Sequence, residues 1–225
     1  MSFLFHNYFV ILRAGTKRKN DMKTKQLVSI MFGCLTALCV TSCLGDDTID
    51  DDSQTLTKAQ IAQCYQTVAG SYSGFLYYEA KSSDGYTTVV DSLDASWYIP
   101  TDSTLIITDF PAKALAEHVS YQPLKAALAE APNKIVNCKT WYIETSPVEF
   151  LVNPYTLEYD LEFDGKQHKV HVVFYVNNTY SFGVYDSSKN MVMKIIPAVI
   201  YVDEQQTSYL NSSQLIFFSN SHKAI

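Results

Sequence analysis

One stretch of this chain allows very few ways of folding. Between residues 155 and 163 every second residue is apolar and the others are polar or acidic, which is the two-residue period of a strand with one buried face. Asp164-Gly165 comes next and favours a two-residue hairpin turn, and apolar residues alternate again over residues 170–176. The sequence therefore predicts an antiparallel β-hairpin.

The turn also predicts how the two strands of this hairpin pair. A two-residue turn that pairs Phe163 with Lys166 places Tyr159 opposite Val170. In this register apolar residues face apolar residues on one side of the hairpin. On the other side acids face bases, in the pairs Asp160–Lys169 and Glu158–His171. The turn and the hydrophobic pattern thus specify the same register.

Further elements follow from periodicity and turn residues. Thr57-x-x-Gln60 fits a capping box that begins a helix, whose apolar residues recur at helical spacing up to Val68. After three strands the period changes over residues 110–131, where Pro111 and Pro123 suit the first turns of two helices. Strands besides the hairpin are predicted at residues 71–80, 88–99, 104–108, 134–144, 179–185, 191–202 and 208–218.

These elements predict a mainly β fold of the α+β class. Eight or nine strands joined by short turns favour an antiparallel meander, either a barrel or a strongly curved sheet. A helix precedes the meander, and a helical pair is inserted after the third strand. Pro197 cannot donate a hydrogen bond to a neighbouring strand, so we expect it at an edge or a bulge.

The first 42 residues differ in character from the rest of the chain. Six of the 17 Lys and Arg residues lie here beside a single acid, Asp21, and they precede a largely apolar run of 14 residues, 27–40. This order is typical of a secretory signal, and 14 residues are too few to span a hydrocarbon core of roughly 30 Å as a helix. The run ends at Val40-Thr41-Ser42-Cys43, which resembles a bacterial lipobox and implies acylation of Cys43.

The chain is therefore predicted to have four parts. Residues 1–21 are interpreted as a start-site extension, because Met22 opens a complete basic region of its own, and residues 22–42 as the lipoprotein signal peptide. Residues 43–55 form an acidic tether, in which five Asp within ten residues repel one another. Residues 56–225 are expected to form a single globular β-rich domain.

Two wider resemblances add expectations. The lipobox and the Asp run, together with Gly70 to Tyr78, Asp94-Ala95-Ser96-Trp97 and Thr108-Asp109-Phe110-Pro111, resemble uncharacterised lipoproteins of gut Bacteroidota, a domain of unknown function of the DUF4840 type. This resemblance implies a lipid-anchored outer-membrane protein facing the periplasm or the cell surface, with no assigned activity. Gly70-Ser71-Tyr72 is also similar to the opening of lipocalin-like (calycin) domains, in which such an aromatic closes the barrel floor.

The sequence offers few groups for catalysis or metal binding. It contains no nucleophile elbow, phosphate-binding loop, dinucleotide-binding glycine pattern or metal-ligand spacing. Glu158 opposite His171 is the best acid–base pair, which can be a solvated ion pair or the site of a hydrolase. Cys64 and Cys138 can form a disulfide or remain separate core thiols. No cofactor is expected, and the 11 basic and 22 acidic residues from Cys43 onward argue against nucleic-acid binding.

The favoured hypothesis is a lipid-anchored, non-enzymatic binding or accessory domain of the outer membrane. Such a domain would hold a small apolar ligand, a glycan or an envelope protein in an aromatic-lined cavity or on a concave face. The alternatives are the hydrolase and a structural partner in an envelope complex, which predicts an exposed apolar patch. The candidate ligand-binding residues, each of which could instead be ordinary core packing, are Tyr72, Tyr77, Trp97, Trp141, Tyr155 and Tyr159.

Overall fold

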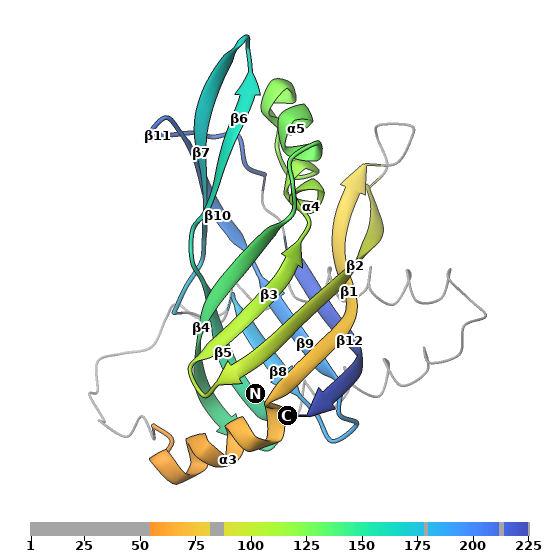
Figure 1. Cartoon of the computed structure of the whole chain (residues 1–225), viewed down its shortest axis with the longest axis vertical. Helices are drawn as coiled ribbons and strands as arrows, with labels where there is room; N and C mark the ends of the chain where they lie inside the picture. Colours follow the sequence, from red (N-terminus) through yellow and green to blue (C-terminus); the bar gives the residue numbers. More distant parts are fainter. Residues whose placement is uncertain (1–54, 82–87, 178–179, 212–213, 225) are drawn as a thin grey trace, which may run out of the picture.

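Eight antiparallel strands close into a barrel, and a second sheet of four strands extends from one rim (Figure 1). The structure is a computed structural model that describes residues 55–81, 88–177, 180–211 and 214–224. Around the barrel the strands follow the order β1 (Gly70–Lys81), β12 (Leu215–Ala224), β9 (Met191–Ile195), β8 (Phe182–Tyr185), β5 (Val148–Pro154), β4 (Lys134–Thr145), β3 (Thr104–Phe110) and β2 (Thr88–Thr101). The predicted mainly β class is confirmed, and of the two predicted forms the chain adopts the barrel.

The predicted hairpin forms with the predicted register. It consists of β6 (Leu157–Phe163) and β7 (Lys166–Phe174), and Tyr159 lies opposite Val170. The turn residues Asp164 and Gly165 both have positive φ angles, 52° and 75°, as the favoured two-residue hairpin turn requires. The hairpin belongs to the second sheet, whose strand order is β11 (Gln205–Gln206), β10 (Pro197–Val202), β7 and β6.

The single strand predicted over residues 191–202 is wrong in one respect, because it is two strands. Residues 191–195 form β9 in the barrel, and Pro197 begins β10 in the second sheet. Pro197 has no backbone N–H, so the barrel ladder cannot continue through it. The register between β10 and β7 shifts between Pro197 and Val199, which confirms the predicted bulge.

Two other assignments also need correction. Residues 148–154 were not predicted as a strand, yet they form β5, which pairs with β4 and β8. The strand predicted over residues 208–218 instead runs from Leu215 to Ala224. In the segment before it, Leu210 forms an isolated bridge with Val119, and the Tyr209 carbonyl oxygen accepts from the Ser120 backbone N–H at 2.8 Å. This segment therefore packs against the helical pair.

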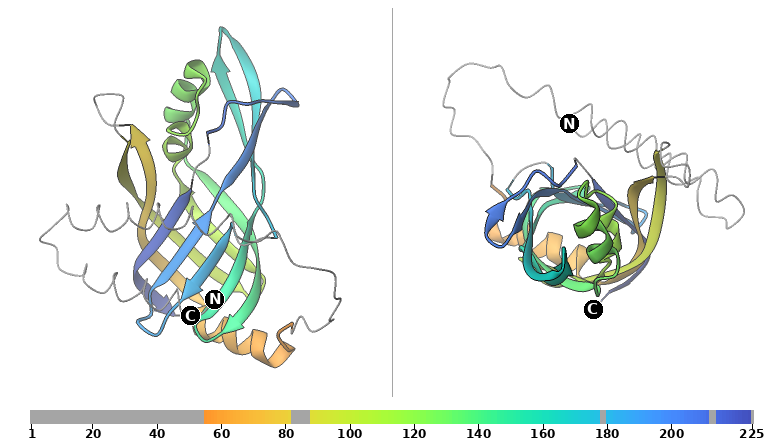
Figure 2. Two further views of the ribbon diagram at one scale, coloured as in Figure 1. Left: turned by 180° about the vertical axis from the view of Figure 1, so that it is seen from behind. Right: turned by 90° about the horizontal axis from the view of Figure 1, so that it is seen from above.

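The helices cover the two ends of the barrel. At the floor, α3 (Lys58–Val68) begins with the predicted capping box of Thr57 and Gln60 and buries Cys64 and Val68. At the opposite rim lie α4 (Ala112–Ala116) and α5 (Gln122–Ala129), each preceded or opened by the predicted proline. The view from above in Figure 2 shows this helical pair over the barrel opening, beside the β6–β7 hairpin.

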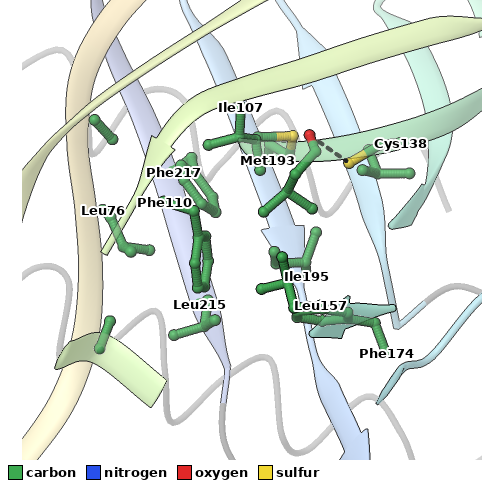
Figure 3. Packing of buried hydrophobic residues seen from close by; sticks show 14 of the residues in the cluster. Leu76, Ile107, Phe110, Cys138, Leu157, Phe174, Met193, Ile195, Leu215 and Phe217 are labelled. Carbon is green, nitrogen blue, oxygen red and sulfur yellow. Dashed lines mark hydrogen bonds between the residues drawn. The ribbon is translucent and has the colours of Figure 1, made fainter. Parts of the chain in front are cut away.

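A single cluster of buried side chains runs through the barrel into the second sheet. Figure 3 shows part of it, with Phe110 and Phe217 next to each other; their ring centroids are 6.4 Å apart. Phe217 also makes an edge contact with Trp97 toward the floor, and Phe110 makes one with Phe174 of β7. Aromatic contacts therefore connect the barrel core to the second sheet.

The closing seam between β1 and β12 depends on a glycine. The register of this pair shifts between Ser73 and Gly74, and a Cβ added at Gly74 would overlap the carbonyl oxygen of Phe218. Any side chain at this position would push the first and last strands apart. A residue without a Cβ is therefore required where the barrel closes.

We expect Gly74→Ala to lower the free energy of unfolding by about 3 kcal/mol or more, as for severe overpacking. Urea denaturation followed by circular dichroism measures this. The matched control is Gly165→Ala, because nothing lies within 4 Å of a Cβ added at Gly165 and only its positive φ opposes the change. The control should lose about 1–2 kcal/mol, and an equal loss in both variants would contradict the steric explanation.

Candidate functional site

The six candidate ligand-binding residues separate into four buried and two exposed side chains. Trp97 is 1% exposed, and Tyr72, Tyr159 and Tyr77 are also buried. Trp141 and Tyr155 are 59% and 58% exposed. The structure therefore brings no set of all six together, and only the exposed pair can contact a ligand without rearrangement of the core.

Tyr72 and Trp97 belong to a packed cluster at the barrel floor. The Tyr72 ring stacks between His222 of β12, at a centroid distance of 4.3 Å, and Trp97, at 5.7 Å. The Tyr72 hydroxyl donates to the Val68 carbonyl oxygen at 2.5 Å, and Trp97 Nε1 donates to Met191 Sδ at 3.3 Å. Burial raises the pKa of Tyr72 far above its usual value. The Tyr72 hydroxyl and Trp97 Nε1 thus both have hydrogen-bond partners within the protein, as expected for residues that close the barrel floor.

His222 completes this floor cluster through both of its ring nitrogens. Nε2 lies 3.2 Å from the Ala69 carbonyl oxygen, which can only accept, so Nε2 carries a proton and donates. Nδ1 lies 3.1 Å from the Tyr185 hydroxyl. The last strand is thereby bonded to the end of α3 and to β8. The position that the lipocalin resemblance assigned to Tyr72 is the one it occupies, at the floor.

Trp141 lies on β4, which is labelled in Figure 1, and Tyr155 directly follows β5. Successive residues of a strand point to opposite faces, and on β4 the even-numbered Val136, Cys138 and Tyr142 are buried in the barrel. The odd-numbered residues before Thr145 are exposed, and they are Ile135, Asn137, Lys139, Trp141 and Ile143. We call these five residues and Tyr155 the β4 face.

Tyr155 joins this face through a backbone contact. Its N–H donates to the Asn137 carbonyl oxygen at 2.9 Å, which places it beside the first part of β4. Asn137 and Trp141 are four residues apart on one strand, or roughly 13 Å. The backbone positions of Tyr155 and Trp141 are thus separated by more than the length of a single sugar ring, with Lys139 between them along β4.

Strand β5 forms one border of the β4 face. Leu151 lies directly opposite Trp141, and Asn153 lies directly opposite Lys139. The Asn153 amide is held in place, because its Nδ2 donates to Asn177 Oδ1 at 3.1 Å and its Oδ1 accepts from the Asn177 backbone N–H at 2.6 Å. The border therefore places apolar Leu151 next to Trp141 and the oriented amide of Asn153 next to Lys139.

Prediction from the sequence missed Ile135, Asn137, Lys139 and Ile143 as parts of this face. A signal was present, because residues 134–144 carry apolar side chains at both even and odd positions. Such a strand is either buried on both faces or exposes apolar residues to a partner. Only the tertiary structure distinguishes a strand that is covered on both faces from a strand that exposes one face for binding.

The acid–base pair considered for a hydrolase lies on the polar side of the hairpin. His171 Nδ1 is 3.9 Å from Glu158 Oε1, and His171 Nε2 is 3.9 Å from Glu204 Oε1. The side chains of Glu158 and Glu204 are 75% and 83% exposed. The arrangement is that of a solvated ion pair, in which a neighbouring carboxylate contributes little to stability.

The disulfide considered for Cys64 and Cys138 is not formed, and both residues are buried free thiols. Cys64 Sγ contacts the Glu144 carbonyl oxygen at 3.8 Å, at the floor end of β4. Cys138 lies on β4 six residues before Glu144, which is roughly 20 Å along the strand. Its Sγ contacts the Val136 carbonyl oxygen at 3.9 Å (Figure 3). A disulfide requires Cα atoms within about 7 Å.

The family of the chain can be stated once this geometry is known. A family model described as "Domain of unknown function (DUF4840)" matches residues 67–202. The chain belongs to this family. The match begins at the end of α3 and ends with β10, so it contains the whole β4 face but not the closing strand β12. No curated protein and no solved structure matches the chain.

Two further searches of the described residues concern membrane spans and metals. None of the helices at residues 55–224, outside the gaps given above, has the length and apolar character needed to cross a membrane. Within the same residues no group of three or more His, Cys, Asp and Glu side chains is placed to hold a metal ion.

His118, after α4, gives a testable pH dependence. Burial lowers the pKa of His118 from its ordinary 6.5 to about 4, while Glu117 acts in the opposite direction and Lys125 lowers it further. Because the unfolded chain binds this proton first, the free energy of unfolding should fall from pH 6.5 toward pH 4, by up to about 3 kcal/mol, and then level off. Urea denaturation across this pH range measures the effect.

The control for this pH dependence is His118→Gln, which should make the stability curve shallower over the same interval. NMR titration of the His118 imidazole gives an independent reading, with an expected midpoint near pH 4. A midpoint near 6.5 would show that the buried environment does not disfavour the charged form.

Proposed function

We propose that this protein is a lipid-anchored, non-enzymatic binding domain of the outer membrane, which holds a saccharide on the β4 face. The exposure of Trp141 and Tyr155 supports this proposal most directly. A Trp side chain has the largest apolar surface of any residue, and in a monomer more than half of it is rarely left in water. Apolar surface of this kind on one strand face marks a site of interaction.

The polar residues between the rings favour a saccharide over an apolar ligand. A small apolar molecule is best held in a concave site that encloses most of its surface. The β4 face instead follows one strand, with Lys139 between its two aromatic residues, Asn137 beside Tyr155 and Asn153 at its border. The C–H faces of sugar rings can stack on Trp141 and Tyr155, while their hydroxyls bond to Asn137 and Asn153.

The anchor is compatible with this role. The lipobox ending at Cys43 supports acylation there, and the acidic tether leads to α3 at the barrel floor. The 14 peptide steps from Cys43 to Thr57 span up to roughly 50 Å when extended. A barrel tethered in this way can present the β4 face away from the lipid, toward the periplasm or the cell surface.

We expect Trp141→Ala and Tyr155→Ala each to weaken saccharide binding at least about tenfold without lowering stability, because both side chains are exposed. Binding of the full chain in detergent to a glycan array, followed by calorimetry on each ligand found, measures this effect. The controls are Val89→Ala, at an exposed position of β2, and Trp97→Phe in the core. The first should change neither property, and the second should lower stability alone.

If wild-type protein retains no saccharide, or if Trp141→Ala binds as the wild type does, the proposed site is wrong. Capture of an envelope protein that is lost in Trp141→Ala would assign the same face to a protein partner instead.

The anchor gives a separate prediction. Cys43→Ala should prevent incorporation of radioactive palmitate and move the protein from the membrane fraction to the soluble fraction of a lipoprotein-processing bacterium. Cys64→Ala, which removes a buried thiol, should leave labelling unchanged. Labelling that persists in Cys43→Ala would contradict the assignment of the lipidation site.

A further inference from the structure

Lys139 lies between the two exposed rings of the β4 face. On β4 it is two residues from Trp141 and two from Asn137, whose carbonyl oxygen accepts from the Tyr155 N–H. Its side chain is exposed, and within the described part of the chain it forms no ion pair. A saccharide that stacks on both rings therefore passes the strand position of Lys139.

The surroundings of Lys139 on the two neighbouring strands are uncharged. Thr104 of β3 and Asn153 of β5 lie directly opposite it. On β5 the nearest acid is Glu149, four residues from Asn153 or roughly 13 Å along the strand. Asp102, in the turn between β2 and β3, is exposed and makes no ion pair with Lys139 among the described residues.

Lys139 differs in its neighbours from two other lysines of the described residues. The chain has 23 acidic and 17 basic residues, so acids outnumber bases. Lys125 pairs with Glu117 at 2.9 Å, and on the hairpin Lys169 lies opposite Asp160. Lys139 instead combines an ammonium without an ion pair among the described residues, the fixed Asn153 amide on the neighbouring strand, and an aromatic residue on either side along β4. It is a local positive site on an acidic protein.

We infer that the saccharide bound on the β4 face is anionic, with a carboxylate or sulfate group that pairs with Lys139. This inference rests on the proposed saccharide site and specifies its ligand class. The two rings align the sugar chain along β4, and the ammonium then selects for an acidic substituent at the position between the rings. A charge-assisted hydrogen bond from an ammonium to an oxyanion is stronger than a bond to a neutral hydroxyl.

The test compares charged and neutral forms of the same saccharides. Full-length protein in detergent is titrated calorimetrically with oligogalacturonate and its carboxyl-reduced form, and with κ-carrageenan oligosaccharide and its desulfated form. We expect the wild type to prefer one charged form by about three- to tenfold, with the preference decreasing as salt is added. The two pairs distinguish a carboxylate from a sulfate.

Variants at Lys139 show whether this side chain is responsible. Lys139→Gln should reduce affinity for the charged form to that for the neutral form, and Lys139→Arg should retain the preference because it keeps the charge. Lys166→Gln, at an exposed cation that begins β7, is the control and should bind as the wild type does. Thermal unfolding of each variant confirms that the fold is unchanged.

The possible failures are distinguishable. If Trp141→Ala abolishes binding but Lys139→Gln binds charged and neutral saccharides as the wild type does, the site is correct and the anionic ligand is wrong. If the wild type binds neutral forms more tightly than charged ones, the inference is overturned as well. If no saccharide binds to the wild type, both the inference and the proposed function fail.

Discussion

Pairing between β1 and β12 is the contact on which the rest of the structure depends. Gly70 lies opposite Ala224 and Tyr77 opposite Ile216, so the barrel closes by joining the first and last parts of the described chain. Closing so long a loop costs conformational entropy that only the completed barrel core can offset. Gly74 permits the close approach, and His222 bonds the closing strand to the end of α3. The β4 face is positioned by this closed ring.

Local signals allowed accurate prediction where one short segment determines the outcome. Asp164-Gly165 and the alternation around it specified the register of Tyr159 with Val170, and Thr57 with Gln60 specified the start of α3. The division of residues 191–202 at Pro197 depends on which sheet each half joins, and that is decided by distant strands. The position of β12 depends likewise on its partners β1 and β9. Such long-range pairings leave only weak traces in the local pattern.

In the candidate site, too, the sequence specified the residue types but not where the side chains lie. Trp97 and Trp141 are both flanked by alternating residues in predicted strands, yet one is in the core and the other is on the surface. Their chemistry is identical, and only the parity of each position relative to the barrel axis separates them. On β4 that parity was ambiguous because both faces carry apolar residues. The uncharged neighbours of Lys139, Thr104 and Asn153, come from strands β3 and β5, which lie well apart from it in sequence.

The proximity of Gly70 to Ala224 has a consequence for the topology of the chain. Because the two outer ends of the closing seam lie side by side, the order of strands around the barrel is circular, and no strand pair is first or last in space. A linker from Ala224 to the start of α3, with a new opening in the Asp164-Gly165 turn, would preserve every strand neighbour and keep α3 in the chain. The arrangement of strands around the barrel therefore does not depend on where the chain termini lie. Circular permutation could move the termini without changing which surfaces face outward.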